Sequence, residues 1–181
     1  MNITEQQREN LKTLAEGLLT LPKDYTHFDM DAFYVGDSEP VLRPNKVYNE
    51  SMPCGTVACA AGHGPMFGIQ PTQEQIDMLV KNSIPLSWRV YEALCFTGDD
   101  IEFSERFSES VWARGDIDLF DWCFGSTWTV CDNTPHGAAK RILYALKEGI
   151  PEDYHEIISK KRPYPWETEE DYKKRVKEYE L

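Results

Sequence analysis

The sequence predicts a mainly α-helical protein, folded as a compact single domain of several helices. Three observations support this fold class. Apolar residues recur at helical spacing, capping residues precede these segments, and Pro or Gly follows them. The chain has 181 residues, of which 41% are hydrophobic, and this is enough for one buried core. We expect a globular helical domain over residues 1–150 and a helical extension over 151–181, packed on that domain or on a partner.

The N-terminal segment has the clearest helical pattern. Its apolar residues at positions 11, 14, 15, 18 and 19 form one stripe along a helix. Thr4 and Gln7 have the spacing of a capping box, and Pro22 predicts the end of the helix. Residues 24–53 have no such pattern and are predicted to be an irregular connection. Within 31–53, the pairs Val41–Leu42 and Lys46–Tyr48 suggest a small β-hairpin.

Capping and breaker residues predict the remaining helices. A run of small residues from Thr56 indicates a tightly packed helix that ends at the breaker Gly62–Pro65. The segment 135–148 is the best marked, because Thr134 can cap it, Pro135 occupies its first position and Gly149 follows it. Further helices are expected after Thr72, after Ser87, and over 104–113, 116–124, 151–160 and 168–179.

Charge is strongly acidic and unevenly distributed. The chain has 31 Asp and Glu against 19 Lys and Arg, a net charge of −12, which argues against direct nucleic-acid binding because that needs a basic face. Nine acids and two arginines lie between Glu92 and Asp121, so more than half of the net charge falls there. The simplest interpretation is a solvated face, and the alternative is a docking surface for a basic partner. The candidate binding acids are Asp99, Asp100, Glu102, Asp116 and Asp118.

The sequence lacks three features that would indicate a membrane or secreted protein. No apolar run approaches the ~18 residues of a membrane span, so we expect no membrane partner. The N-terminus lacks the basic and apolar regions of a secretory signal. The five cysteines are odd in number, which together with the missing signal predicts free thiols and not a disulfide framework. We therefore expect a soluble intracellular protein.

The stretch from Cys54 to His63, CGTVACAAGH, is the most distinctive part of the sequence. A cysteine at a helix N-terminus gains thiolate character, so Cys54 or Cys59 is a possible nucleophile, with His63 or His136 as its base. Zinc is the second possibility, with Cys54, Cys59 and His63 as ligands and Cys123 or Cys131 as the fourth. In the third interpretation these residues only fill the start of a packed helix.

The spacing favours the structural interpretation. His63 lies four residues after Cys59, and thiol enzymes do not take their base from such a local pair. The two cysteines are separated by four residues, at the edge of the zinc-binding range, and no second ligand pair follows. We therefore expect no catalytic residue, no metal and no cofactor.

Three tryptophans, Trp112, Trp122 and Trp128, lie within the acidic region and just after it. Rings of this size are typical core residues. The alternative is an aromatic pocket in which a planar ligand stacks, such as a small nucleotide. Its phosphates would then need donors from a helix N-terminus, for example at Thr134, aided by Lys140 and Arg141.

Three short motifs occur along the chain: Phe28-x-Met30, the Cys-Gly-Thr-x-x-Cys-x-x-Gly motif at 54–62, and Thr134-Pro135 leading through Ala138-Ala139-x-x-Ile142 to Gly149. Together they resemble a loose family of small uncharacterised proteins of tailed bacteriophages and bacteria. The resemblance spans about residues 10–150, with 31–53 as an insertion. It implies no activity, only a phage-borne accessory protein in the bacterial host cytoplasm. Members more often carry a bulky aromatic residue where this chain has His63, which argues against His63 as a base.

These observations favour a phage-encoded accessory protein that binds a host protein without catalysis. Counteracting a bacterial defence system is one role that this context suggests. Two alternatives stay open, a sponge that sequesters a small nucleotide signal and a cysteine-dependent hydrolase.

Overall fold

The structure is a computed structural model that describes residues 3–30, 59–82, 88–98, 100–102, 112–114, 117–159 and 162–179. Helices dominate these residues, which confirms the predicted mainly α-helical class. Among them, no helix is both long and apolar enough to cross a bilayer. The division of the chain into a domain over 1–150 and an extension over 151–181 stays a prediction.

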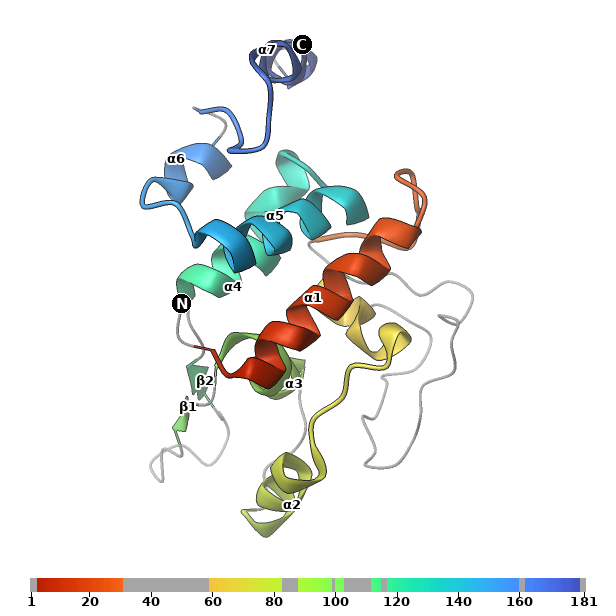
Figure 1. The fold of residues 1–181 in the computed structure, drawn as a ribbon, viewed down its shortest axis with the longest axis vertical. Helices are drawn as coiled ribbons and strands as arrows, with labels where there is room; N and C mark the ends of the chain where they lie inside the picture. The colour runs from red at the N-terminus through yellow and green to blue at the C-terminus, as the bar shows by residue number, and fades with distance from the viewer. Residues whose placement is uncertain are drawn as a thin grey trace.

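The elements follow one another as a series of helices with one short strand pair (Figure 1). Three of the helical segments are not α-helices: η1 and η3 are 3₁₀-helices, and η2 is a π-helix that continues α3. The bounds are α1 Glu5–Thr20, η1 Ala61–Phe67, α2 Gln73–Lys81, α3 Trp88–Glu92, η2 Ala93–Thr97, β1 Asp100–Glu102, β2 Trp112–Arg114, α4 Ile117–Phe124, η3 Ser126–Val130, α5 Pro135–Glu148, α6 Tyr154–Ile158 and α7 Glu169–Tyr179.

Helix α1 lies alongside α5 in the middle of the molecule (Figure 1). The predicted capping box is present, since the Thr4 N–H donates to Gln7 Oε1 at 2.8 Å and the Gln7 N–H donates to Thr4 Oγ1 at 3.2 Å. The helix ends before Pro22, as predicted. Leu11, Leu14 and Leu18 are completely buried, but Leu19 is 42% exposed and lies outside the stripe.

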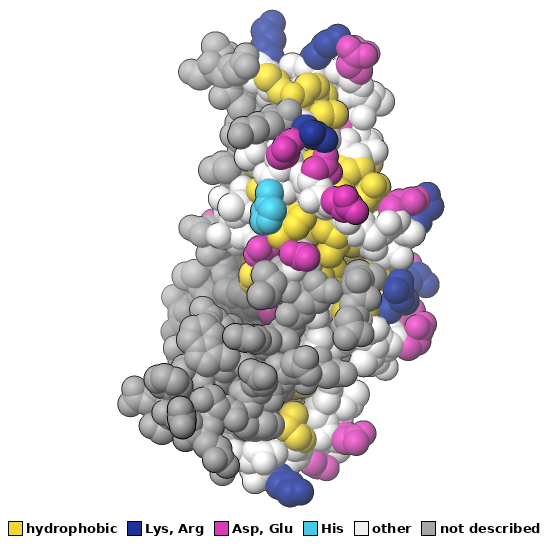
Figure 2. Space-filling view, turned by 90° about the vertical axis from the view of Figure 1, so that its left-hand side faces the viewer, with side chains coloured by type: hydrophobic (Ala, Val, Ile, Leu, Met, Phe, Trp, Pro, Cys, Tyr) yellow, Lys and Arg dark blue, Asp and Glu magenta, His cyan; other side chains and the backbone are white. Residues whose placement is uncertain are grey.

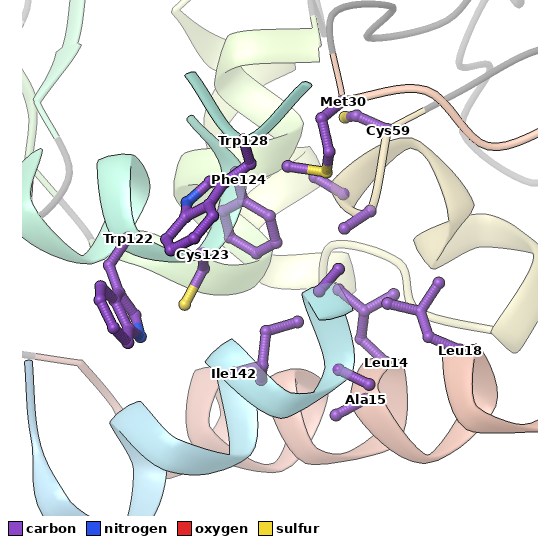
Figure 3. Close-up of a cluster of buried hydrophobic side chains, with 14 of the residues drawn as sticks. Leu14, Ala15, Leu18, Met30, Cys59, Trp122, Cys123, Phe124, Trp128 and Ile142 are labelled. Atoms are coloured by element: carbon purple, nitrogen blue, oxygen red, sulfur yellow. The ribbon is translucent and has the colours of Figure 1, made fainter. Parts of the chain in front are cut away.

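The core forms where α1, α5, α4 and η3 meet. Figure 3 shows Leu14, Ala15 and Leu18 from α1 facing Ile142 of α5, with aromatic side chains of α4 and η3 on the other side. Residues after position 150 also enter this core, because Tyr154, Ile157, Ile158 and Tyr164 are buried in the same cluster. The segment predicted as an extension therefore contributes to the main core of the chain.

Two segments differ from the prediction. In the described part of the small-residue run, the 3₁₀-helix η1 starts at Ala61 and continues through Gly62–Pro65, where the prediction ended the helix. It ends at Phe67 and is capped by Gly68, whose φ of 78° glycine tolerates. The predicted start at Thr56 lies outside the described residues. The helix expected over 104–113 is wrong at its end, because Trp112–Arg114 pairs with Asp100–Glu102 as an antiparallel strand. Pairing between distant segments overrides a weak local pattern there. The hairpin suggested within 31–53 lies outside the described residues.

Candidate functional site

A cleft of about 400 Å³ opens between α4, η3 and α6. Helix α4 contributes Phe120 and Asp121, and α6 contributes His155 and Ile158. The remaining lining residues are Gly125, Ser126, Thr127 and Ser159. The lining thus combines an aromatic and an aliphatic side chain with a carboxylate, an imidazole and three hydroxyl groups. On the face shown in Figure 2, acidic side chains border a histidine and a patch of hydrophobic atoms.

Hydrogen bonds hold the cleft walls in place. Trp128 Nε1 donates to the Asp121 carbonyl at 3.2 Å, which fixes η3 against α4. The Tyr154 hydroxyl donates to Asp118 Oδ1 at 3.0 Å, which fixes α6 against the same helix. Gly125 connects α4 to η3, and a Cβ at this position would lie 2.6 Å from the Asp121 carbonyl oxygen. A side chain at position 125 would therefore force the two walls apart.

Two carboxylates, Asp121 in the cleft lining and Asp118 beside it, have no Lys or Arg partner among the described residues. Burial raises the pKa of Asp121, His155 lowers it, and the nearby Asp118 raises it further. Arg162 on the far side of α6 pairs with Asp153 and, at 2.7 Å, with Glu156. Within the described part of the chain, no Lys or Arg forms an ion pair with Asp118 or Asp121. Among the described residues, His155 is therefore the group that offsets the negative charge of Asp121.

The structure places the predicted binding acids in different environments. Asp118 lies on α4, one turn before Asp121, beside the cleft. Asp100 and Glu102 belong to β1, and their side chains lie outside the described residues, as do Asp99 and Asp116 entirely.

Glu92, at the start of the predicted acidic face, is not a surface residue. It is 7% exposed and accepts a hydrogen bond from the Thr97 hydroxyl at 2.6 Å. Burial raises its pKa to about 7. The predicted docking face from Glu92 to Asp121 is therefore wrong at its first residue, because the turn from α3 into η2 directs this carboxyl inward.

The aromatic rings belong to the core. Trp122 and Trp128 are 0% exposed and pack edge to face, with ring centroids 5.6 Å apart. Tyr154 and Trp166 also contact Trp122. In this structure the chain's own rings fill the space in which a planar ligand would stack. Trp112 belongs to β2, and its side chain lies outside the described residues.

The cysteine motif supplies a buried thiol and a buried, neutral imidazole. Cys59 is 1% exposed, and burial raises its pKa to about 11, although backbone N–H groups of Gly62 and Ala61 act in the opposite sense. His63 Nδ1 lies 2.8 Å from the Cys59 carbonyl oxygen, and burial lowers the pKa of the imidazole. His136 Nε2 contacts the Leu21 carbonyl at 2.8 Å. Cys59 thus lacks the lowered pKa that a nucleophile needs, and Cys54 lies outside the described residues.

The residues that the structure describes contain no cluster of side chains that could bind zinc. There, no three side chains of His, Cys, Asp or Glu come together in a way that would hold a metal ion. The Cys131 thiol, 2% exposed, donates instead to the Ile158 carbonyl at 2.9 Å, beneath α6. Cys123 is also buried, on α4.

Comparison of the chain with protein-family models, with curated proteins and with solved structures gives no match. The resemblance to small phage and bacterial proteins therefore stays a prediction. The cleft itself was reached only in part from the sequence. Asp118 was a candidate, Asp121 was counted among the acids of its stretch, and His155 carried no signal because its role depends on the packing of α6 on α4.

Proposed function

We propose that the chain is a non-catalytic accessory protein that binds a protein partner, and that the cleft between α4, η3 and α6 receives a basic side chain of that partner. The observation that carries this proposal is the pair of carboxylates, Asp118 and Asp121, which have no Lys or Arg partner among the described residues and lie at one cleft. A cation placed there would relieve the repulsion between the two carboxylates. It would also oppose the rise that burial causes in the pKa of Asp121.

The lining of the cleft suits an arginine or lysine side chain. Phe120 and Ile158 offer apolar contact to the methylene stem of such a residue. The hydroxyl oxygens of Ser126, Thr127 and Ser159 are acceptors for the N–H groups of its charged end. A volume of about 400 Å³ is at the small end of ligand sites, which fits one inserted side chain better than a large cofactor.

The resemblance described above suggests the setting of this interaction. In a tailed bacteriophage, an accessory protein of this kind would act in the bacterial host cytoplasm on a host protein. Counteraction of a bacterial defence system is the role that we propose in that setting. An acidic protein with a net charge of −12 would meet a basic partner surface rapidly and in a salt-dependent manner.

A direct test uses a minimal basic probe. We expect the peptide Gly-Arg-Gly to shift the imidazole signals of His155 and the Nε1–H signal of Trp128 in NMR spectra, with saturation. The variant Asp118→Asn/Asp121→Asn should lose the response. The control Glu16→Gln/Glu74→Gln changes the net charge equally at exposed residues outside the cleft and should keep it.

The same two variants then test the protein partner. From a bacterial lysate, the wild-type chain and the control should retain a host protein that elutes as salt rises, and the cleft variant should not. Equal peptide responses in all three proteins, or retention of the same host proteins by the cleft variant, would contradict the proposal.

A further inference from the structure

Arg141 is a completely buried cation whose hydrogen bonds are only half satisfied. It lies on α5, is 0% exposed, and its Cζ is 4.2 Å from the centroid of the Trp128 ring. Its Nη1 donates to the Asp132 carbonyl at 3.2 Å and lies 3.8 Å from Asp132 Oδ2. Its Nε and Nη2, which form the opposite edge of the guanidinium, have no hydrogen-bond partner among the residues that the structure describes.

Arg175 on α7 provides an internal comparison. Its Nε donates to Glu167 Oε1 at 2.8 Å, and its Nη2 donates to Glu167 Oε2 at 2.9 Å. A carboxylate therefore fills the Nε–Nη2 edge of Arg175 in the bidentate geometry that guanidinium groups favour. On Arg141, this same edge has no hydrogen-bond partner among the described residues, and Asp132 lies beside Nη1 instead. The two arginines are buried in the same part of the molecule, yet only Arg175 has a carboxylate on its Nε–Nη2 edge.

Other unmet donors lie close to the Trp128 ring. The ring of Tyr164 packs on Trp128 with centroids 5.6 Å apart, and Arg175 Cζ lies 3.9 Å from the Tyr164 centroid on another side. Within the described part of the chain, the Tyr164 hydroxyl and Arg175 Nη1 are buried without a hydrogen-bond partner. An unpaired buried donor is unfavourable, and a charged one more so, which is why proteins seldom leave several together.

We propose that the Nε–Nη2 edge of Arg141 binds a small oxyanion, either a phosphate or a carboxylate, in the core between α5 and the segment that leads to α7. The neutral Tyr164 hydroxyl is a further donor in the same region. Asp132 does not supply the missing acceptor, because it contacts Nη1 and accepts the Thr134 hydroxyl at 2.8 Å. None of the residues that line the α4–η3–α6 cleft is part of this site, so the inference is independent of the proposed function.

The charge and burial of Arg141 define the kind of ligand. Burial lowers its pKa to about 10, so the guanidinium still carries its full charge at neutral pH. An anion bound there would therefore experience a desolvated cation, and this strengthens their attraction. Because Arg141 is 0% exposed, the ligand must be small, and it must exchange slowly through a local opening of the chain.

The decisive experiment follows the arginine Nε–H signals of the full chain by NMR. The protein is unfolded in guanidinium chloride and refolded in Tris chloride beforehand, so that any anion carried through purification is removed. One arm of the titration adds sodium phosphate, the other adds sodium acetate, and sodium chloride keeps the ionic strength constant. The variant Arg141→Lys keeps the charge, lacks the bidentate edge and assigns the signal. Arg162→Lys is the matched control at an exposed arginine.

We expect the Arg141 signal to reach a new position with saturation while the Arg175 signal stays in place. A response to phosphate alone would define a phosphate site, and a response to acetate would define a carboxylate site. At about 100 times Kd, the same anion should raise the Tm of the wild type and of Arg162→Lys by about 5–10 °C but not that of Arg141→Lys. An Arg141 Nε–H signal that does not move with either anion, or Tm values that rise equally in all three proteins, would overturn the inference. If Arg141→Lys does not fold, the wild-type titration still decides.

Discussion

Two regions of this molecule bury ionisable side chains in opposite ways. Around η1 and η2, burial raises the pKa values of Cys59, Cys95 and Glu92 and lowers that of His63, so each group is held toward its neutral form. Around α5 and α7, the buried groups include the guanidinium ions of Arg141 and Arg175, which stay charged beside the neutral Tyr164 hydroxyl. Thiols, carboxyls and imidazoles escape the cost of burial by losing their charge, whereas a guanidinium needs an anion.

This difference indicates which buried groups find hydrogen-bond partners within the described residues and which do not. In the η1–η2 region, neutral groups use local acceptors, as when His63 contacts the Cys59 carbonyl. In the α5–α7 region, Glu167 completes Arg175 but nothing described completes Arg141. Trp128 connects this second region to the cleft, since its ring lies against Arg141 and its Nε1 bonds to Asp121.

Removing the anion of Arg175 should give the largest effect. Glu167→Gln leaves a buried guanidinium without its counter-charge, so we expect the free energy of unfolding to fall by about 3–5 kcal/mol in urea titrations. Glu169→Gln is the matched control, because Glu169 pairs with Lys173 in solvent and should change stability by less than about 1 kcal/mol. Equal losses in the two variants would mean that Arg175 does not depend on its buried partner.

Neutralising Glu92 should instead stabilise the protein, and only at higher pH. The carboxyl titrates near 4.5 when unfolded and near 7 when folded, so folding takes up a proton between these values. The wild-type free energy of unfolding therefore falls as pH rises through this window. We expect Glu92→Gln to be about 3 kcal/mol more stable than wild type at pH 8 and equal to it near pH 4. A constant difference from pH 4 to 8 would contradict the burial of this carboxyl.

The wild-type curve also contains a contribution of opposite sign from His63. Its pKa is lowered on folding, so its contribution to stability is lost as pH falls below about 6.5. Because both wild type and Glu92→Gln contain His63, its contribution drops out when their free energies of unfolding are subtracted at each pH. Glu74→Gln, at an exposed position on α2, serves as the control for the loss of one negative charge.

A smaller effect is expected at the start of α5. The Thr134 hydroxyl accepts the Gly137 N–H at 2.9 Å and donates to Asp132 Oδ1, the carboxylate that faces Arg141. We expect Thr134→Ala to reduce the free energy of unfolding by about 1 kcal/mol and Thr134→Ser to restore most of it. If this bond holds Asp132 in place beside Arg141, the Arg141 Nε–H signal should also shift in the alanine variant. An unchanged signal would mean that Thr134 does not position Asp132 against Arg141.

The sequence predicted the parts of the fold that depend on local signals. The caps at Thr4, Thr72 and Thr134 lie where expected, because a hydroxyl and a nearby N–H are close in the chain itself. It did not predict the π-helix η2, where the buried side chain of Gln7 donates to the carbonyls of Ala93 and Leu94, both at 3.2 Å. Such a contact joins residues more than 80 positions apart and leaves no periodic pattern.

The same limit applies to the two sites. Asp118 was found from local acidity, whereas His155 reaches the cleft only because Tyr154 fixes α6 to α4. The sequence names Arg141 only within the nucleotide alternative, as an aid to phosphate binding at a helix N-terminus. What distinguishes Arg141 in the structure is its complete burial, with Nε and Nη2 unpaired among the described residues. Burial and unmet hydrogen bonds are properties of the packed molecule and not of the sequence pattern.

The most direct test of the contrast between the two arginines is a crystal structure of the full chain grown in the presence of phosphate. We expect tetrahedral density for a phosphate whose oxygen atoms lie about 2.7–2.9 Å from both Nε and Nη2 of Arg141, with Glu167 still on the same edge of Arg175. A carbonyl or carboxylate of the chain itself on that edge of Arg141 would contradict it, because the buried cation would then be satisfied without a ligand.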